Sequence, residues 1–197
     1  MTGESIEPLV DALVVKLSDR SSAHPAMRFP MDAAEADRAG LYAWWADAVG
    51  LAVLSAVFDV GLPPLIYAGQ AGATSTRSKT ERAATLRSRI GGNHLNGNVT
   101  SSTFRKPLTA VLHQPLALQL HASGRLARDS NTAVSSWMRE HLSVAIAPVD
   151  DRSRLAVIEA AVLGRLDPPL NLMGMRATPV RMRLRQLRSE LRAEQSA

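Results

Sequence analysis

Two short runs of aliphatic and aromatic residues constrain the fold of this chain more than any other feature. The runs GLYAWW at 40–45 and LIYAG at 65–69 are bounded by glycine or proline, a pattern typical of buried β-strands. A third apolar run, at 143–149, alternates enough to predict a further strand. Apolar residues at helical spacing, or helix-compatible composition, occupy 4–19, 78–90, 104–113, 132–142, 152–166 and 178–194.

Strands interleaved with helices predict an α+β fold, a small α/β sandwich. We expect a short antiparallel β-sheet of about three strands, flanked by helices, with extra N- and C-terminal helices. Residues 49–60 fit either a short apolar helix or a loop packed on the core. The basic helix at 78–90 is predicted to stop at Gly91-Gly92, and Asp150 or Asp151 is expected to cap the helix at 152–166.

Composition excludes several classes of protein. A chain of 197 residues has room for one domain with decorations. The absence of cysteine excludes disulfide scaffolds, cysteine nucleophiles, iron–sulfur clusters and cysteine-ligated zinc, and the five histidines lack zinc-ligand spacing. The longest nearly uncharged stretch, 48–72, contains Asp59 and two prolines, so no membrane partner is expected. The acidic N-terminus does not resemble a secretion signal, and we expect a cytoplasmic protein.

Positive charge is concentrated in two zones. Residues 71–106 hold seven basic side chains and one acidic, and residues 151–197 hold nine basic and five acidic. Twenty of the 23 basic residues are arginine, whose planar fork suits phosphate. In the last helix four arginines follow one stripe, Arg181, Arg185, Arg188 and Arg192. This pattern indicates a polyanionic partner, although solvated helix faces would give the same count.

The chain has two tyrosines, Tyr42 and Tyr67, and each lies within a predicted strand. On these two motifs the sequence resembles the GIY-YIG nuclease family. The resemblance aligns GLYAWW with the first motif and IYAG at 66–69 with the second, with Leu41 and Ala68 replacing isoleucines. If the resemblance were misleading, the two residues would be ordinary core aromatics.

The remaining family pattern follows in order along the chain. The arginine on a short helix matches Arg89 in TLRSRI, with Arg87 as a near alternative. The following histidine matches His94, five residues after Arg89, so its register is open. A glutamate on a later helix matches Glu159, and the asparagine after a proline turn matches Asn171 in DPPLN. The resemblance covers about residues 40–172 and implies a DNA endonuclease.

The chemistry implied by the resemblance is phosphodiester hydrolysis. Glu159, in an otherwise apolar helical segment, would hold one hard cation, Mg²⁺ with Mn²⁺ as a substitute. Arg89 would bind the scissile phosphate by paired hydrogen bonds. Asn171 is expected to anchor its turn and the backbone of the site rather than to react.

Tyr42 is expected to activate the water nucleophile, directly or through a neighbour, and Tyr67 to position water or phosphate. A free tyrosine has a pKa of about 10, so we expect nearby cations, meaning the metal, Arg89 and His94, to favour the phenolate. His94 would relay a proton or contact phosphate. Activity should then rise toward alkaline pH.

We divide the chain into an N-terminal helical extension (1–39), a GIY-YIG-like nuclease core with insertions (40–172) and a basic C-terminal helix (173–197). The extra segments could read bases and shape a homodimer. Duplex DNA is the expected partner, and a restriction-type enzyme is favoured because no helicase or zinc module is visible. A repair or recombination nuclease and a non-catalytic DNA-binding module stay open. The expected DNA contacts are Gln70, Arg77, Lys79, Arg82, Arg87, Asn96, Ser102, Arg105 and Lys106.

Overall fold

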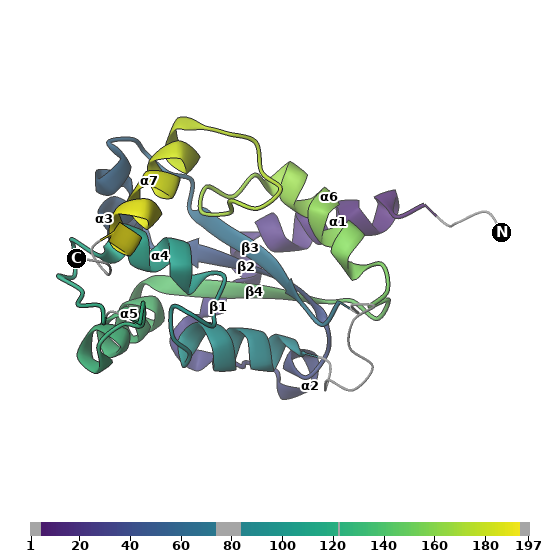
Figure 1. The fold of residues 1–197 in the computed structure, drawn as a ribbon. Helices are drawn as coiled ribbons and strands as arrows, with labels where there is room; N and C mark the ends of the chain where they lie inside the picture. The colour runs from purple at the N-terminus through teal and green to yellow at the C-terminus, as the bar shows by residue number, and fades with distance from the viewer. Residues whose placement is uncertain (1–4, 74–83, 122, 194–197) are drawn as a thin grey trace.

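A four-stranded antiparallel sheet forms the centre of the computed structural model, which describes residues 5–73, 84–121 and 123–193 (Figure 1). The strand order is β1-β4-β2-β3. Its strands are β1 (His24–Pro25), β2 (Gly40–Ala46), β3 (Leu65–Ala71) and β4 (Leu142–Pro148). The α+β class is confirmed. The three predicted strands are present, and the two-residue β1 adds a fourth that the sequence did not predict.

The central strand β2 is buried along its whole length. Alternate side chains of a strand point to opposite faces, so Tyr42 and Trp44 enter one apolar cluster while Leu41, Ala43 and Trp45 enter the other. The sheet is therefore covered on both faces, and the two tyrosine-containing strands lie between two layers of helices.

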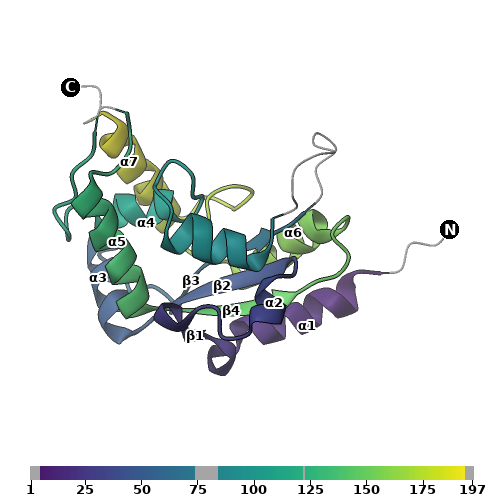
Figure 2. The same cartoon turned by 90° about the horizontal axis from the view of Figure 1, so that it is seen from below.

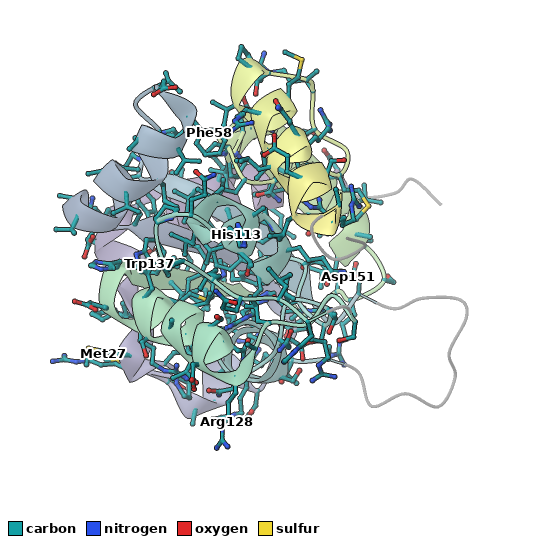
Figure 3. All side chains as sticks on the ribbon, turned by 60° about the vertical axis from the view of Figure 1, so that its left-hand side comes forward. Met27, Phe58, His113, Arg128, Trp137 and Asp151 are labelled. Carbon is teal, nitrogen blue, oxygen red and sulfur yellow. The ribbon has the colours of Figure 1, made fainter. Side chains whose placement is uncertain are left out.

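Helices cover both faces of the sheet (Figures 1 and 2). Helices α1 and α6 pack together on the face that holds Leu41 and Trp45. Helices α3, α4, α5 and α7 contribute to the apolar cluster on the other face, and Figure 3 labels Phe58, His113 and Trp137 in or beside them. The helices are α1 (Glu7–Ser18), α2 (Ala33–Ala36), α3 (Ala48–Phe58), α4 (Arg105–Leu112), α5 (Arg128–His141), α6 (Leu155–Leu166) and α7 (Pro179–Ala193). None of the helices described is long and apolar enough to cross a membrane.

Two details of the sequence expectations are settled by these boundaries. The open segment at 49–60 is mostly helical, as α3. The helix predicted at 152–166 begins at Leu155, and its N-cap is Arg154, which makes no side-chain capping bond, so the expected cap at Asp150 or Asp151 is wrong. Asp151 instead closes the preceding turn, where it accepts hydrogen bonds from the backbone N–H groups of Ser153 and Arg154.

The basic helix predicted at 78–90 is wrong in its C-terminal boundary. A π-helix, η3, covers Arg87–Leu95 and runs through Gly91-Gly92 instead of stopping there. Each glycine costs a helix up to about 1 kcal/mol relative to alanine. Ile90, His94 and Leu95 are buried on either side of these glycines, and their packing outweighs that cost. The part of the prediction at 78–83 lies outside the described residues.

The C-terminal arginine stripe is divided by burial. Arg181 is 1% exposed, and its guanidinium donates to the backbone oxygens of Asn171 and Pro168 and to the carboxylate of Asp167, at 2.7–2.9 Å. This arginine fastens α7 to the turn that follows α6 and is not placed to contact phosphate. Arg185, one turn later, is exposed.

Replacing Arg181 should therefore cost stability rather than DNA affinity. Arg181→Met removes four side-chain hydrogen bonds, one of them to the Arg176 carbonyl, and leaves buried carbonyls without donors, so we expect a loss of about 3 kcal/mol in the free energy of unfolding. Arg185→Met on the same helix is the matched control and should change it by less than about 0.5 kcal/mol. Urea unfolding followed by circular dichroism measures both; equal effects would contradict the anchoring role.

Candidate active site

Tyr42 and Tyr67 lie on neighbouring strands and point to the same face of the sheet. In the β2–β3 register Tyr42 is opposite Gly69, and Trp44 is opposite Tyr67. The Tyr67 ring packs against Phe104, with ring centroids 4.7 Å apart, and its hydroxyl donates to the Thr103 hydroxyl at 3.2 Å. The two phenols thus share one side of the sheet, where η3 and the loop before α4 cover them.

Gly69 makes room for the Tyr42 hydroxyl. A Cβ atom at position 69 would lie 2.7 Å from Tyr42 Oη and 3.0 Å from its Cζ, closer than packed atoms approach. The glycine of the second motif is therefore required by the tyrosine of the first. This close approach connects the two motifs physically, although 26 residues lie between Tyr42 and Gly69 in the chain.

The π-helix brings Arg89 and His94 to the same site. Residues five apart face the same side of a π-helix, whereas in an α-helix they would diverge by more than a quarter turn. His94 Nε2 lies 2.7 Å from Tyr42 Oη, and the Arg89 charge is close enough to lower the pKa of His94. The five-residue spacing that left the register open in the sequence is thus accommodated by the helix type.

A chain of hydrogen bonds continues from Tyr42 into the core. His94 Nδ1 lies 2.7 Å from Ser102 Oγ, and this oxygen accepts the backbone N–H of Arg105 at 3.0 Å. His94 and Ser102 are fully buried. Ser102 was expected to contact DNA, and this is wrong for the structure described, because its hydroxyl is inaccessible and orients the imidazole.

Arg105 was also expected to contact DNA, and its burial contradicts this. The side chain is fully buried and donates to the His94 carbonyl, to Ser135 Oγ and to both oxygens of Asn131. Burial lowers the pKa of Arg105 to about 10. Arg105 therefore holds the backbone of His94 from within the core and does not face a ligand.

Burial decides the protonation of the central pair. It raises the pKa of Tyr42 well above 10, and the opposing effect of Arg89 is smaller. Burial, with Arg89 and Arg105, lowers the pKa of His94 to about 3, so the imidazole is neutral. Arg89 favours the phenolate, as expected, but burial outweighs its effect, and His94 carries no charge with which to help. In the protein without a metal, Tyr42 therefore keeps its proton and faces an uncharged base.

Glu159 on α6 approaches the pair from the edge of β3. Together with Tyr42, Ala68 and Gly69 it lines a narrow gap that has no room for a water-sized sphere. Burial raises the pKa of its carboxyl to about 6, although Arg89 and the backbone N–H of Gln70 act in the opposite direction. A partly desolvated carboxylate near two phenols is a suitable single ligand for a hard cation that takes its other ligands from water and phosphate. The described residues contain no cluster of three or more metal-binding side chains.

The structure separates the two candidate arginines. Arg87 forms an ion pair with Asp37 at 2.5 Å and also donates to the Ala33 carbonyl. Arg89 has a buried Nε that meets no acceptor among the described residues, and its charge acts on Tyr42, His94 and Glu159. An arginine with an unused donor at this point is placed to receive an anion.

Asn171 also supports the site from the free edge of β3, the edge that does not pair with β2. Its Oδ1 accepts the backbone N–H of Ala68 and its Nδ2 donates to the Ala68 carbonyl, at 3.0 and 2.8 Å. The amide thus pairs with the free edge of the strand between Tyr67 and Gly69. Asn171 holds the backbone of the second motif and does not face the tyrosine hydroxyls.

The remaining predicted DNA contacts are dispersed. Gln70 accepts the Ala73 N–H, Asn96 is exposed and accepts from Arg139, and Lys106 is half-buried at the start of α4. The basic segment with Arg77, Lys79 and Arg82 lies outside the described residues. The sequence analysis did not identify Thr103 or Phe104, which hold Tyr67, because a threonine and a phenylalanine beside a polar loop carry no pattern of their own.

A family model described as the GIY-YIG catalytic domain matches residues 40–190. The chain belongs to this family. No curated protein and no solved structure matched the chain in the other two comparisons.

The GIY-YIG match covers the two tyrosine motifs, η3 and Glu159. It supports an endonuclease, a hydrolase that acts on DNA, and enzymes with this domain generally use a divalent metal. The match runs past residue 172 and includes most of α7, the helix that Arg181 fastens to the core.

Gly69→Ala tests the close approach within the GIY-YIG motifs. The added methyl must displace the Tyr42 hydroxyl from His94, so we expect DNA cleavage to slow by roughly 10- to 100-fold and stability to fall by about 1–3 kcal/mol. Gly164→Ala on α6 is the control: its Cβ would meet open space, and the variant should cleave normally and be slightly more stable. Full activity of Gly69→Ala would refute the steric argument.

Glu159→Gln should make the metal-free protein more stable. Because folding raises the pKa of Glu159 from 4.5 to about 6, the ionised carboxylate destabilises the fold above this range and the penalty vanishes below it. In EDTA at pH 7 we expect a gain on the order of 1 kcal/mol, disappearing near pH 4. Thermal unfolding at both pH values measures this, with the exposed Glu140→Gln as the control; a loss of stability at pH 7 would contradict it.

Proposed function

We propose that this GIY-YIG protein is a Mg²⁺-dependent endonuclease, with Mn²⁺ as a substitute, that hydrolyses phosphodiester bonds in duplex DNA in the manner of a restriction enzyme. One observation carries the proposal: the 2.7 Å hydrogen bond between Tyr42 and a neutral His94, beside an arginine with an unused buried donor. A base and a phosphate ligand next to one carboxylate are the parts that phosphodiester hydrolysis requires.

The proton has a defined route away from the attacking water. Tyr42 accepts the water proton as its own hydroxyl proton passes to His94 Nε2, which lies 2.7 Å away. For this transfer Nε2 of His94 must be unprotonated, so the resting proton lies on Nδ1 and forms a hydrogen bond to Ser102 Oγ. The same oxygen accepts a second hydrogen bond from the backbone N–H of Arg105. The pair stays neutral until negative charge develops at the phosphate, and a nearby negative charge raises the proton affinity of the imidazole.

Arg89 binds the scissile phosphate through the donors that the fold leaves unused, and Tyr67 positions it from the neighbouring strand. Glu159 would hold the metal ion, alone among the site residues. When bound, the ion supplies charge neutralisation at the phosphate and at the leaving oxygen. The protein contributes the fixed positions of these groups, because both tyrosine strands are buried and Asn171 locks β3 in place.

The restriction-type assignment rests on the loop that follows η3. Asn96, Thr100, Ser101 and Thr103 are exposed there, and Thr103 touches Tyr67 directly. Short amide and hydroxyl side chains are suited to hydrogen bonding with base edges in a groove. A loop of this kind beside the reacting groups supports reading of the sequence close to the cut, whereas a branch-specific nuclease needs contacts to DNA shape.

Cleavage assays with matched substrates test the proposal. The purified protein is incubated under single-turnover conditions with long duplexes of mixed sequence and with flap and branched DNA, in Mg²⁺, Mn²⁺ or EDTA. We expect discrete duplex fragments in either metal and none in EDTA. Tyr42→Phe should lower the cleavage rate by about 10²–10⁴-fold. Tyr67→Phe should lower it less, because only Tyr42 forms a hydrogen bond with His94, the proposed proton acceptor.

Each outcome assigns one function. Cuts confined to flaps or branches would indicate a repair nuclease, and binding without any cut would indicate a non-catalytic DNA-binding module. Thermal unfolding of Tyr42→Phe should show a loss of about 1–2 kcal/mol, since a buried acceptor loses its partner. A wild-type cleavage rate in Tyr42→Phe would remove the proposed proton route.

A further inference from the structure

A pocket outside the catalytic groups lies between α4, α7 and the loop that follows η3. Its volume is about 280 Å³. Figure 3 shows α7, in yellow, lying across the end of α4 that His113 marks, and these two helices are in direct contact. The pocket is lined by Val99, Thr100, Lys106, Leu120, Gly124, Arg188, Leu191 and Arg192.

The pocket is basic and has no acidic wall. Three of its lining residues are cations, Lys106 from α4 and Arg188 and Arg192 from α7, and none of the described lining residues is a carboxylate. Arg188 is only half-exposed and forms no ion pair with any described carboxylate. Burial and the like charge of Arg192 both lower the pKa of Arg188. Burying the guanidinium of Arg188 beside other cations is unfavourable unless an anion joins it.

The same helix shows how arginines here are otherwise accommodated. Arg181 is paired with Asp167, and Arg183 is paired with Glu190. Arg188 lies on the same helical stripe as Arg181, but it lines the pocket and is not paired with a described carboxylate. The cations of Arg188 and Lys106, with the Thr100 hydroxyl, form a donor set for phosphate oxygens.

One segment of the chain, residues 99–106, contacts both the pocket and the active site. Val99 and Thr100 line the pocket, and Thr103, three residues later, accepts the hydroxyl of Tyr67. Lys106 follows Thr103 within one helical turn. A DNA strand that presents a phosphate to Arg89 and Tyr67 therefore carries its neighbouring nucleotides along this loop toward α7. The apolar walls from Val99, Leu120 and Leu191 leave space for a deoxyribose.

We propose that this pocket binds a backbone phosphate of the DNA substrate that flanks the scissile bond, with Arg188 and Lys106 as the principal contacts. The proposal rests on the function proposed above and adds a second, sequence-independent anchor to it. Such an anchor fixes the register of the duplex on the enzyme and makes affinity depend on salt.

Binding measurements in EDTA test this without cleavage. Fluorescence anisotropy with a labelled duplex of about 30 base pairs gives Kd for the full chain over a series of salt concentrations. We expect Arg188→Gln and Lys106→Gln each to weaken binding roughly tenfold at low salt and to reduce the log–log salt slope by about 0.9, the value for one phosphate contact. Arg188→Lys should keep the slope.

Arg185→Gln is the matched control. It removes the same charge from an exposed position of the same helix, outside the pocket, and should change Kd less than about twofold. Duplexes shortened from both ends should lose the difference between the wild type and Arg188→Gln once the flanking phosphate is gone. Thermal unfolding of each variant establishes that it is folded before binding is compared.

The results separate this proposal from the proposed function. An unchanged salt slope in Arg188→Gln, with normal DNA binding and cleavage by the wild type, would overturn the pocket assignment and leave the nuclease intact. Wild-type protein that neither binds nor cuts DNA would overturn the nuclease and the pocket together. Inorganic phosphate or a mononucleotide that binds as tightly as the duplex would show a small-anion site and overturn the DNA assignment.

Discussion

The buried hydrogen bonds from Tyr42 through His94 to Ser102 are the interaction on which the rest of the site depends. Polar groups in an apolar core are costly unless each finds a partner, so the tyrosine, the imidazole and the hydroxyl fix one another. The last member is held by the backbone of Arg105, whose side chain bonds the His94 carbonyl. Moving any one member leaves another unpaired, and this makes the arrangement rigid before substrate binds.

The fold accommodates this chain with two local compromises. A π-helix with two glycines replaces an ordinary α-helix so that Arg89 and His94 face the same side. Gly69 in β3 leaves the space that the Tyr42 hydroxyl occupies, because it has no Cβ atom. Each departs from the most stable local choice, and each positions a group that the proposed reaction uses. Departures of this kind are expected where function, rather than stability, selects the conformation.

Arginine serves three different purposes in this protein. Arg105 and Arg181 are buried and hold backbone segments together. Arg87 is paired with Asp37 at the surface. Arg89 and Arg188 are partly buried with unused capacity, and they face the two places where we propose that DNA phosphates bind. The basic composition alone indicates a polyanionic partner, but the pairing of each arginine decides which of them can meet it.

The sequence by itself determined the strand runs at 40–45 and 65–69, most of the helices that cover them and the residues that resemble GIY-YIG motifs, because these follow from local periodicity and from fixed residue types. It could not show that Ser102 and Arg105 are internal, that Arg89 rather than Arg87 faces the site, or that His94 is neutral. Those properties were decided only by the tertiary structure. Burial and pairing depend on contacts between residues far apart in the chain, such as Tyr42 with His94 and Arg105 with Asn131, and local sequence carries no record of them.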